Sequence, residues 1–161
     1  MHRVEQFFGH LRAEVRADEV ARAHSLLPTE ARPLFDAMPI ADRRHALDVV
    51  GRLIGVQHDD PDLLAAALLH DVAKGHRMRL WHRVGGVLLA AVAPRLLARL
   101  ASPDPRSWRY PCHLYLHHAE LSADVAARAG CSPRTVALIR GTAQGADASL
   151  AAALAAADEA S

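Results

Sequence analysis

A seven-residue run without a polar side chain, LLAAALL over residues 63–69, most constrains how this chain can fold. Asp60-Pro61 precedes the run, and a capping aspartate followed by proline in the first turn is typical of a helix start. Alanine and leucine favour helix, and a helix that is apolar on all sides has to be buried. We therefore expect a buried helix over residues 61–74, with Gly75 as its C-terminal stop.

Two ionisable residues, His70 and Asp71, come directly after this apolar run. A buried histidine or carboxylate costs free energy unless a partner satisfies it. In a helix with about 100° per residue, both side chains share one face with Ala67 and Lys74, and the small alanine leaves space beside them. The two residues are either a hydrogen-bonded core pair or part of a larger site.

Apolar residues recur at helical spacing along most of the chain, and no alternating strand pattern of useful length is present. The sequence therefore predicts an all-α fold, a compact single-domain helical bundle. Helices are expected over about 3–24, 42–56, 61–74, 80–101 with a break at Pro94, 113–130, 133–140 and 147–160, with loops over 26–40 and 102–112. Asp42 is the expected N-cap of the second helix, and Ser132-Pro133 opens the 133–140 helix. We divide the chain into an N-terminal helix and connecting loop, 1–39, which pack on the core, and a helical domain, 40–161.

Composition narrows the class of protein. The formal net charge of the 161 residues is +1 and 23% are charged, which argues against disorder and gives no reason to expect a nucleic acid polymer as partner. The N-terminus does not resemble a signal peptide, and the longest apolar run, 84–93, is too short to span a bilayer. We therefore expect a cytoplasmic protein without a membrane partner. Cys112 and Cys131 lack a zinc-site spacing and are expected to be structural.

Basic residues are concentrated in one part of the chain. Between Lys74 and Arg109 there are eight of them against one acid, Asp104. This stretch is either an anion-attracting surface or a solvated arginine-rich face.

Two more candidate ligands lie on other predicted helices. His45 falls at the edge of the apolar stripe of its helix, and Asp158 lies near the end of the last helix. With His70 and Asp71 they supply two imidazoles and two carboxylates, a donor set that suits one divalent cation. Spacing alone leaves the alternatives open, namely a surface histidine at position 45 and a solvated helix end at position 158.

The order H…HD…D on successive helices, with RRHALDVV, ALLHDVAKG and ALAAADEAS around its members, resembles the HD-domain metal-dependent phosphohydrolase superfamily. The resemblance covers roughly residues 40–161 and implies an HD-type fold. It also implies one divalent metal ion (Mn, Fe, Co, Ni, Zn or Mg) held by His45, His70, Asp71 and Asp158. The implied activity is hydrolysis of a phosphate ester of a small metabolite or nucleotide by a metal-activated water. The alternative is a non-catalytic metal- or nucleotide-binding regulatory module on the same scaffold.

The resemblance also suggests roles for residues around the metal ligands. Asp71 would orient the attacking water, and Lys74 would neutralise charge on the phosphate. For Lys74 a lysine that complements a helix C-terminus is an equal alternative. His118, Arg77 and Arg79 are the expected substrate-binding residues. For His118 a surface histidine is an equal alternative, and Arg83 is a further candidate for the phosphate.

One branch of the family carries a histidine pair where this chain has Gly141 and Thr142. The missing pair favours one metal over two. The apolar spacing of the N-terminal helix leaves open whether it covers the core or forms a homodimer contact.

Overall fold

The computed structural model describes residues 14–75, 78 and 80–161, and every regular element among them is helical. This confirms the all-α fold class. The α-helices are α2 (Ala17–Leu26), α3 (Arg32–Asp36), α4 (Ile40–Gly55), α5 (Pro61–Leu69), α6 (Leu80–Val92), α7 (Pro94–Leu100), α8 (Tyr110–Arg128), α9 (Pro133–Arg140) and α10 (Ala148–Ala160), and two 3-10 turns, η1 (Thr29–Ala31) and η3 (Gly145–Asp147), precede α3 and α10. None of the described helices combines the length and the apolar character that crossing a membrane requires.

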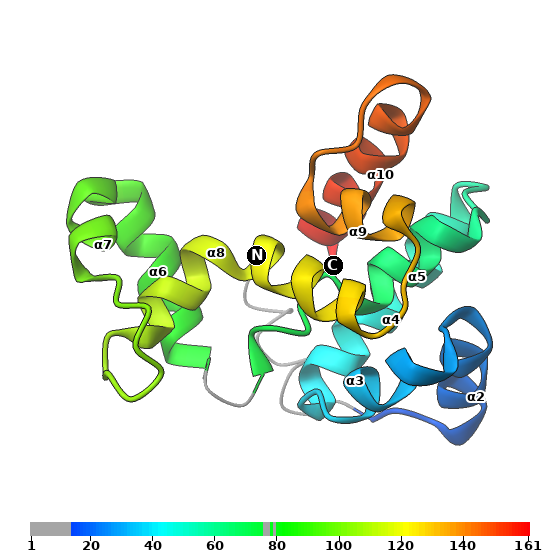
Figure 1. Ribbon diagram of the computed structural model, residues 1–161, viewed down its shortest axis with the longest axis horizontal. Coiled ribbons are helices and arrows are strands. Elements are labelled where there is room, and N and C mark those ends of the chain that lie inside the picture. The colour runs from blue at the N-terminus through cyan, green and yellow to red at the C-terminus, as the bar shows by residue number, and fades with distance from the viewer. Residues whose placement is uncertain (1–13, 76–77, 79) are drawn as a thin grey trace.

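Helix α5 lies at the centre of the core. Every residue from Leu63 to Leu69 is buried, as the apolar run predicts. Helices α4, α9 and α10 pack against α5, and α2 and α3 contact it from the N-terminal part of the chain (Figure 1). The predicted cap is confirmed, because Oδ1 of Asp60 accepts hydrogen bonds from the backbone N–H groups of Asp62 and Leu63.

The structure corrects the predicted end of this helix. Helix α5 ends at Leu69 rather than at residue 74, and residues 70–74 form consecutive turns. Gly75 does stand in a left-handed conformation, with φ of +47°, but it ends these turns and not the helix. The backbone N–H of Ala73 donates to the hydroxyl of Ser122 on α8, 3.1 Å away, so a long-range contact holds the turns in place.

The N-terminal part of the chain also differs from the prediction. The helix expected over 3–24 is seen as α2, and its residues 3–13 lie outside the described part of the chain. The expected loop over 26–40 contains η1 and α3, because Pro33 occupies the first turn of α3, where a missing N–H costs nothing. Pro39 is the N-cap of α4, so Asp42 is not the cap but a buried residue of the first turn.

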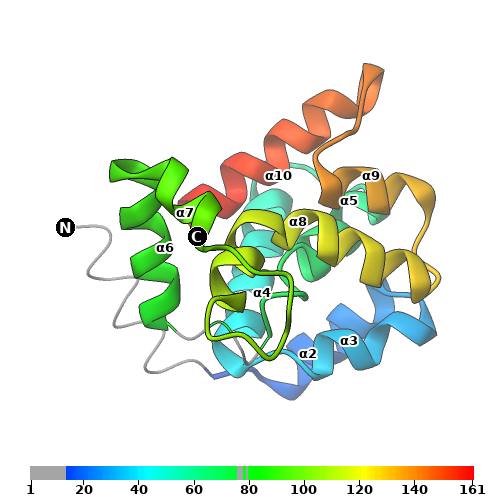
Figure 2. The ribbon, with the colours of Figure 1, turned by 60° about the vertical axis from the view of Figure 1, so that its left-hand side comes forward.

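Helices α6 and α7 form an arm beside the N-terminal half of α8 (Figures 1 and 2). The break predicted at Pro94 is confirmed, since Ala93 separates the two helices. The two helices α6 and α8 approach closely at Gly86, where a Cβ atom would lie 2.6 Å from Cδ2 of Tyr115. Helix α8 begins at Tyr110, three residues before the predicted start.

A single arginine joins the starts of three elements. The guanidinium of Arg134 on α9 binds the carboxylates of Asp60 and Asp62, at 2.7 and 3.3 Å, and that of Asp147 at 2.8 Å. Ser132 caps α9 as predicted, because its hydroxyl accepts a hydrogen bond from the N–H of Thr135. Because Asp147 is the N-cap of α10, these contacts hold the starts of α5, α9 and α10 together at the end of the core away from His70.

Candidate metal centre

Three of the four predicted metal ligands converge in the structure. His45 comes from α4, His70 follows the last residue of α5, and Asp158 lies in the last turns of α10. One potential ligand atom from each residue lies within 4.8 Å of the other two. Nε2 of His45 is 2.8 Å from Oδ1 of Asp158, and Nε2 of His70 is 3.3 Å from the same oxygen.

The orientation of His70 follows from the end of α5. The last carbonyl groups of a helix lack intrahelical partners, and the carbonyl of Ala67 accepts a hydrogen bond from Nδ1 of His70 at 2.9 Å. A carbonyl oxygen only accepts, so Nδ1 carries the proton and Nε2 is the nitrogen directed at the cluster. Nε2 is buried, and although Oδ1 of Asp158 lies 3.3 Å away, Nε2 forms no hydrogen bond of regular geometry with the described residues. This is the arrangement in which a metal-ligating histidine is held by its other ring nitrogen.

The fourth predicted ligand, Asp71, lies beside the cluster. Its side chain is 3% exposed, and Oδ2 lies 3.8 Å from Nε2 of His70. The ammonium of Lys74 donates to Oδ2 at 2.6 Å. The other oxygen, Oδ1, is buried, has no hydrogen-bond partner in the described part of the chain and lies 3.8 Å from Nε2 of His118. Asp71 therefore has one oxygen engaged by lysine and one available to another group.

The charges of the cluster favour a cation at its centre. Burial alone would raise the pKa of Asp71, but His70, Lys74 and His118 together lower it to about 2. Burial also opposes ionisation of Asp158, and His45 and His70 outweigh it and lower the pKa of that carboxyl well below its usual range. Conversely, burial disfavours the charged imidazole of His70, but Asp71 and Asp158 raise its pKa. Both carboxylates are thus ionised at neutral pH, and positive charge at Nε2 of His70 is stabilised.

Lys74 does not complement the end of a helix. The helix dipole acts within the last turn of a helix, and α5 ends at Leu69, so Lys74 lies beyond the reach of this dipole. Its ion pair with Asp71 takes the ammonium to the cluster instead, and the side chain keeps 17% of its exposure. Ala67, expected from its small size to leave space beside the ligands, is fully buried and orients His70 through its carbonyl.

Of the three predicted substrate-binding residues, the structure describes His118. His118 faces Asp71 from α8, and its Nδ1 donates to the carbonyl of Tyr115 at 3.0 Å, so Nε2 points toward the site. Burial and the nearby Lys74 lower the pKa of His118, which keeps its imidazole neutral at pH 7. Arg77 and Arg79 lie outside the described residues.

Two features of this centre were missed from the sequence, namely the carbonyl groups of Ala67 and Tyr115 that orient His70 and His118. A histidine just past a helix end is the only signal available, because carbonyl groups there need partners. Gly141 and Thr142, where the resemblance would place a histidine pair, lie at the C-terminal end of α9. Gly141 ends α9 with φ of +72°, a conformation that a histidine rarely adopts.

Comparisons of the chain with protein-family models, with curated proteins and with solved structures found no match. The resemblance to the HD-domain superfamily therefore depends on the residues of the motif and on their convergence.

Proposed function

We propose that this protein is a metal-dependent phosphohydrolase that acts on a phosphate ester of a small metabolite or nucleotide. The observation that supports the proposal most strongly is the convergence of His45, His70 and Asp158 from three helices. Two of these residues are 113 positions apart and still in contact. His70 is buried and the side chain of His45 is 15% exposed, and a bundle that needed only stability would place apolar side chains at these two positions, because burying polar groups is costly.

The residues present fit a divalent cation. His45, His70 and Asp158 would hold it, and the unpartnered Oδ1 of Asp71 is available as a further oxygen ligand. Two imidazoles and two carboxylates suit Mn, Fe, Co, Ni or Zn better than Mg, which prefers oxygen ligands. When bound, such an ion lowers the pKa of a water ligand and polarises a phosphoryl oxygen.

Residues beside the ligands would act on the substrate directly. The ammonium of Lys74 is the cation closest to Asp71 and keeps some access to solvent, so it would bind a phosphate oxygen as charge develops there. The neutral imidazole of His118 carries its proton on Nδ1, which leaves Nε2 to accept a hydrogen bond from the attacking water. Asp71 would orient both groups, since it contacts Lys74 and lies near His118.

A second candidate is a non-catalytic module that binds a metal ion or nucleotide without turnover. One observation favours it: the ion pair between Lys74 and Asp71 already occupies one oxygen of the carboxylate that would orient the water. The two candidates share the metal centre and differ in whether substrate is consumed.

The test begins with purification without chelator and measurement of bound metal by mass spectrometry. We expect close to one equivalent in the wild type after supplementation with Mn, Co, Ni or Zn, a large loss in His70→Ala, and no loss in the control His117→Ala, whose side chain is 45% exposed. Binding of the ion should also raise the melting temperature of the wild type and not that of His70→Ala. Less than about a tenth of an equivalent in the wild type would refute the metal centre.

Turnover separates the two candidates. The metal-loaded protein is assayed against a panel of phosphorylated metabolites and nucleotides. Release of phosphate that Asp71→Ala abolishes supports the hydrolase. Stoichiometric metal with no turnover on the panel, and an Asp71→Ala variant that behaves like the wild type, would support the binding module instead.

A further inference from the structure

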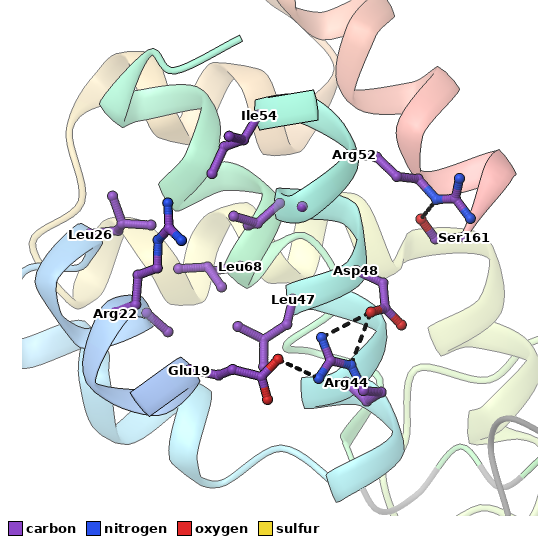
Figure 3. A pocket seen from close by; sticks show the side chains of 13 residues that line it. Glu19, Arg22, Leu26, Arg44, Leu47, Asp48, Arg52, Ile54, Leu68 and Ser161 are labelled. Carbon is purple, nitrogen blue, oxygen red and sulfur yellow. Dashed lines mark hydrogen bonds and ion pairs between the residues drawn. The ribbon is translucent and has the colours of Figure 1, made fainter. Parts of the chain in front are cut away.

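A groove of about 450 Å³ lies between α2 and α4 (Figure 3). None of the cluster residues His45, His70 and Asp158 lines it. Its volume falls in the range of about 300–1,000 Å³ that is usual for small-molecule sites. The apolar residues that line it are Ala23, Leu26, Leu47, Val50, Ile54 and Leu68.

The groove also carries three arginines, of which one is neutralised. The guanidinium of Arg44 lies 2.7 Å from a carboxylate oxygen of Glu19 and 2.9 Å from one of Asp48. Figure 3 shows this arginine held between the two carboxylates. Arg44 is therefore a structural tie between α2 and α4 and has little charge left for a ligand.

The other two arginines have no carboxylate partner among the residues that the structure describes. Nε of Arg52 donates to the neutral hydroxyl of Ser161 at 2.8 Å. The guanidinium of Arg22, which rises from α2 in Figure 3, forms no ion pair or hydrogen bond with the described residues. Among the described residues that line the groove, three arginines face the two carboxylates of Glu19 and Asp48, so the groove combines apolar surface with a net positive charge.

We propose that this groove is a binding site for a small amphiphilic anion. The apolar body of the ligand lies against Leu26, Leu47 and Ile54, and its carboxylate pairs with the exposed Arg22. Complementary charge is the argument for an anion, and the half-buried side chains of Leu26, Leu47 and Ile54 are the argument for an apolar body. The proposal is independent of the proposed hydrolase activity, because it uses none of the metal-centre residues.

The chain offers a matched pair of variants to test this. Gly51 lines the groove, and a Cβ atom there would meet nothing within 4 Å, so a leucine at this position enters the groove without displacing the fold. Gly55 on the same helix also has open space around it but does not line the groove. Both substitutions replace a helical glycine by a good helix former, so neither is expected to unfold the protein.

The experiment titrates the full chain with octanoate by isothermal titration calorimetry, with octanamide and octylamine as neutral and cationic analogues. We expect one saturable site for octanoate, binding weakened about ten-fold or more by Gly51→Leu, and unchanged binding in Gly55→Leu. Arg22→Gln should weaken octanoate about five-fold and leave octanamide unaffected.

Three results would overturn the proposal. They are no saturable octanoate binding, equal binding by Gly51→Leu and wild type, or octylamine binding as tightly as octanoate. Metal content measured on the same samples distinguishes this site from the metal centre, because Gly51→Leu should leave the bound metal unchanged.

Discussion

Replacing Lys74 by methionine should destabilise the protein well beyond what a surface lysine contributes. Nζ of Lys74 lies 2.6 Å from Oδ2 of Asp71, and the two side chains are 17% and 3% exposed. A pKa of about 2 in place of the ordinary 3.8 means that folding stabilises the Asp71 carboxylate by about 2 kcal/mol. Methionine keeps the apolar stem and removes the charge, so the carboxylate is left with His70 and His118.

The expected magnitude follows from this burial. Removing one partner of a fully buried ion pair costs about 3–5 kcal/mol. Because Lys74 retains some solvent access, we expect a loss of about 2–3 kcal/mol in the free energy of unfolding at pH 7. A lysine that only complemented a helix dipole would account for about 0.3–1 kcal/mol.

The assay is urea unfolding of metal-free protein in the presence of a chelator, with Arg95→Met as the control. Arg95 is exposed, and its substitution should change stability by less than about 0.5 kcal/mol. The folded pKa of Asp71 lies below its unfolded value, so its contribution is present above about pH 4 and disappears as pH falls toward 2. The difference in the free energy of unfolding between Lys74→Met and the wild type should therefore decrease as the pH falls from about 4 toward 2. A loss below about 1 kcal/mol at pH 7 would refute the buried ion pair.

Two further predictions concern the helices around the site. Gly86→Ala should destabilise the protein by about 1–3 kcal/mol in thermal or urea unfolding, because its Cβ would meet the ring of Tyr115 at 2.6 Å. The control Gly85→Ala, whose Cβ meets open space, should be neutral or stabilising, and equal effects of the two substitutions would contradict the close helix contact. Arg134→Met should lower the melting temperature at pH 7. Hydrogen bonds from Ser132, Thr135 and Arg134 outweigh burial and lower the pKa of Asp62, so this carboxylate contributes to stability only while it is ionised. The difference in melting temperature between Arg134→Met and the wild type should therefore shrink below about pH 4. A pH-independent difference would contradict that network.

The sequence predicted the centre of the fold well because the signals there are local. The cap at Asp60 and the apolar run after it define the start and the burial of α5 without any distant contact. The end of α5 was predicted wrongly because the stop signal, Gly75, belongs to the turns that follow the helix. Those turns depend on the hydroxyl of Ser122, a residue that is remote in sequence and has no local pattern to mark it.

The candidate site was only partly accessible to sequence reasoning. His70-Asp71 could be singled out as a costly pair at the end of a buried run. Its contact with His45 and Asp158 could not be derived from helical periodicity, which places residues on faces but does not pair helices. The order of the motif suggested that pairing. The ion pair of Lys74 depends on the backbone path after Leu69, which the predicted longer helix concealed.

The most direct test of the account is the coordination sphere of a bound ion. X-ray absorption spectroscopy of the zinc-loaded protein should fit two imidazole ligands together with oxygen ligands, because His45 and His70 both direct Nε2 at Asp158. In His70→Ala, loaded at higher zinc, one imidazole should disappear from the fit. A spectrum that fits no imidazole, or one that is the same in the two proteins, would contradict a metal centre at this cluster.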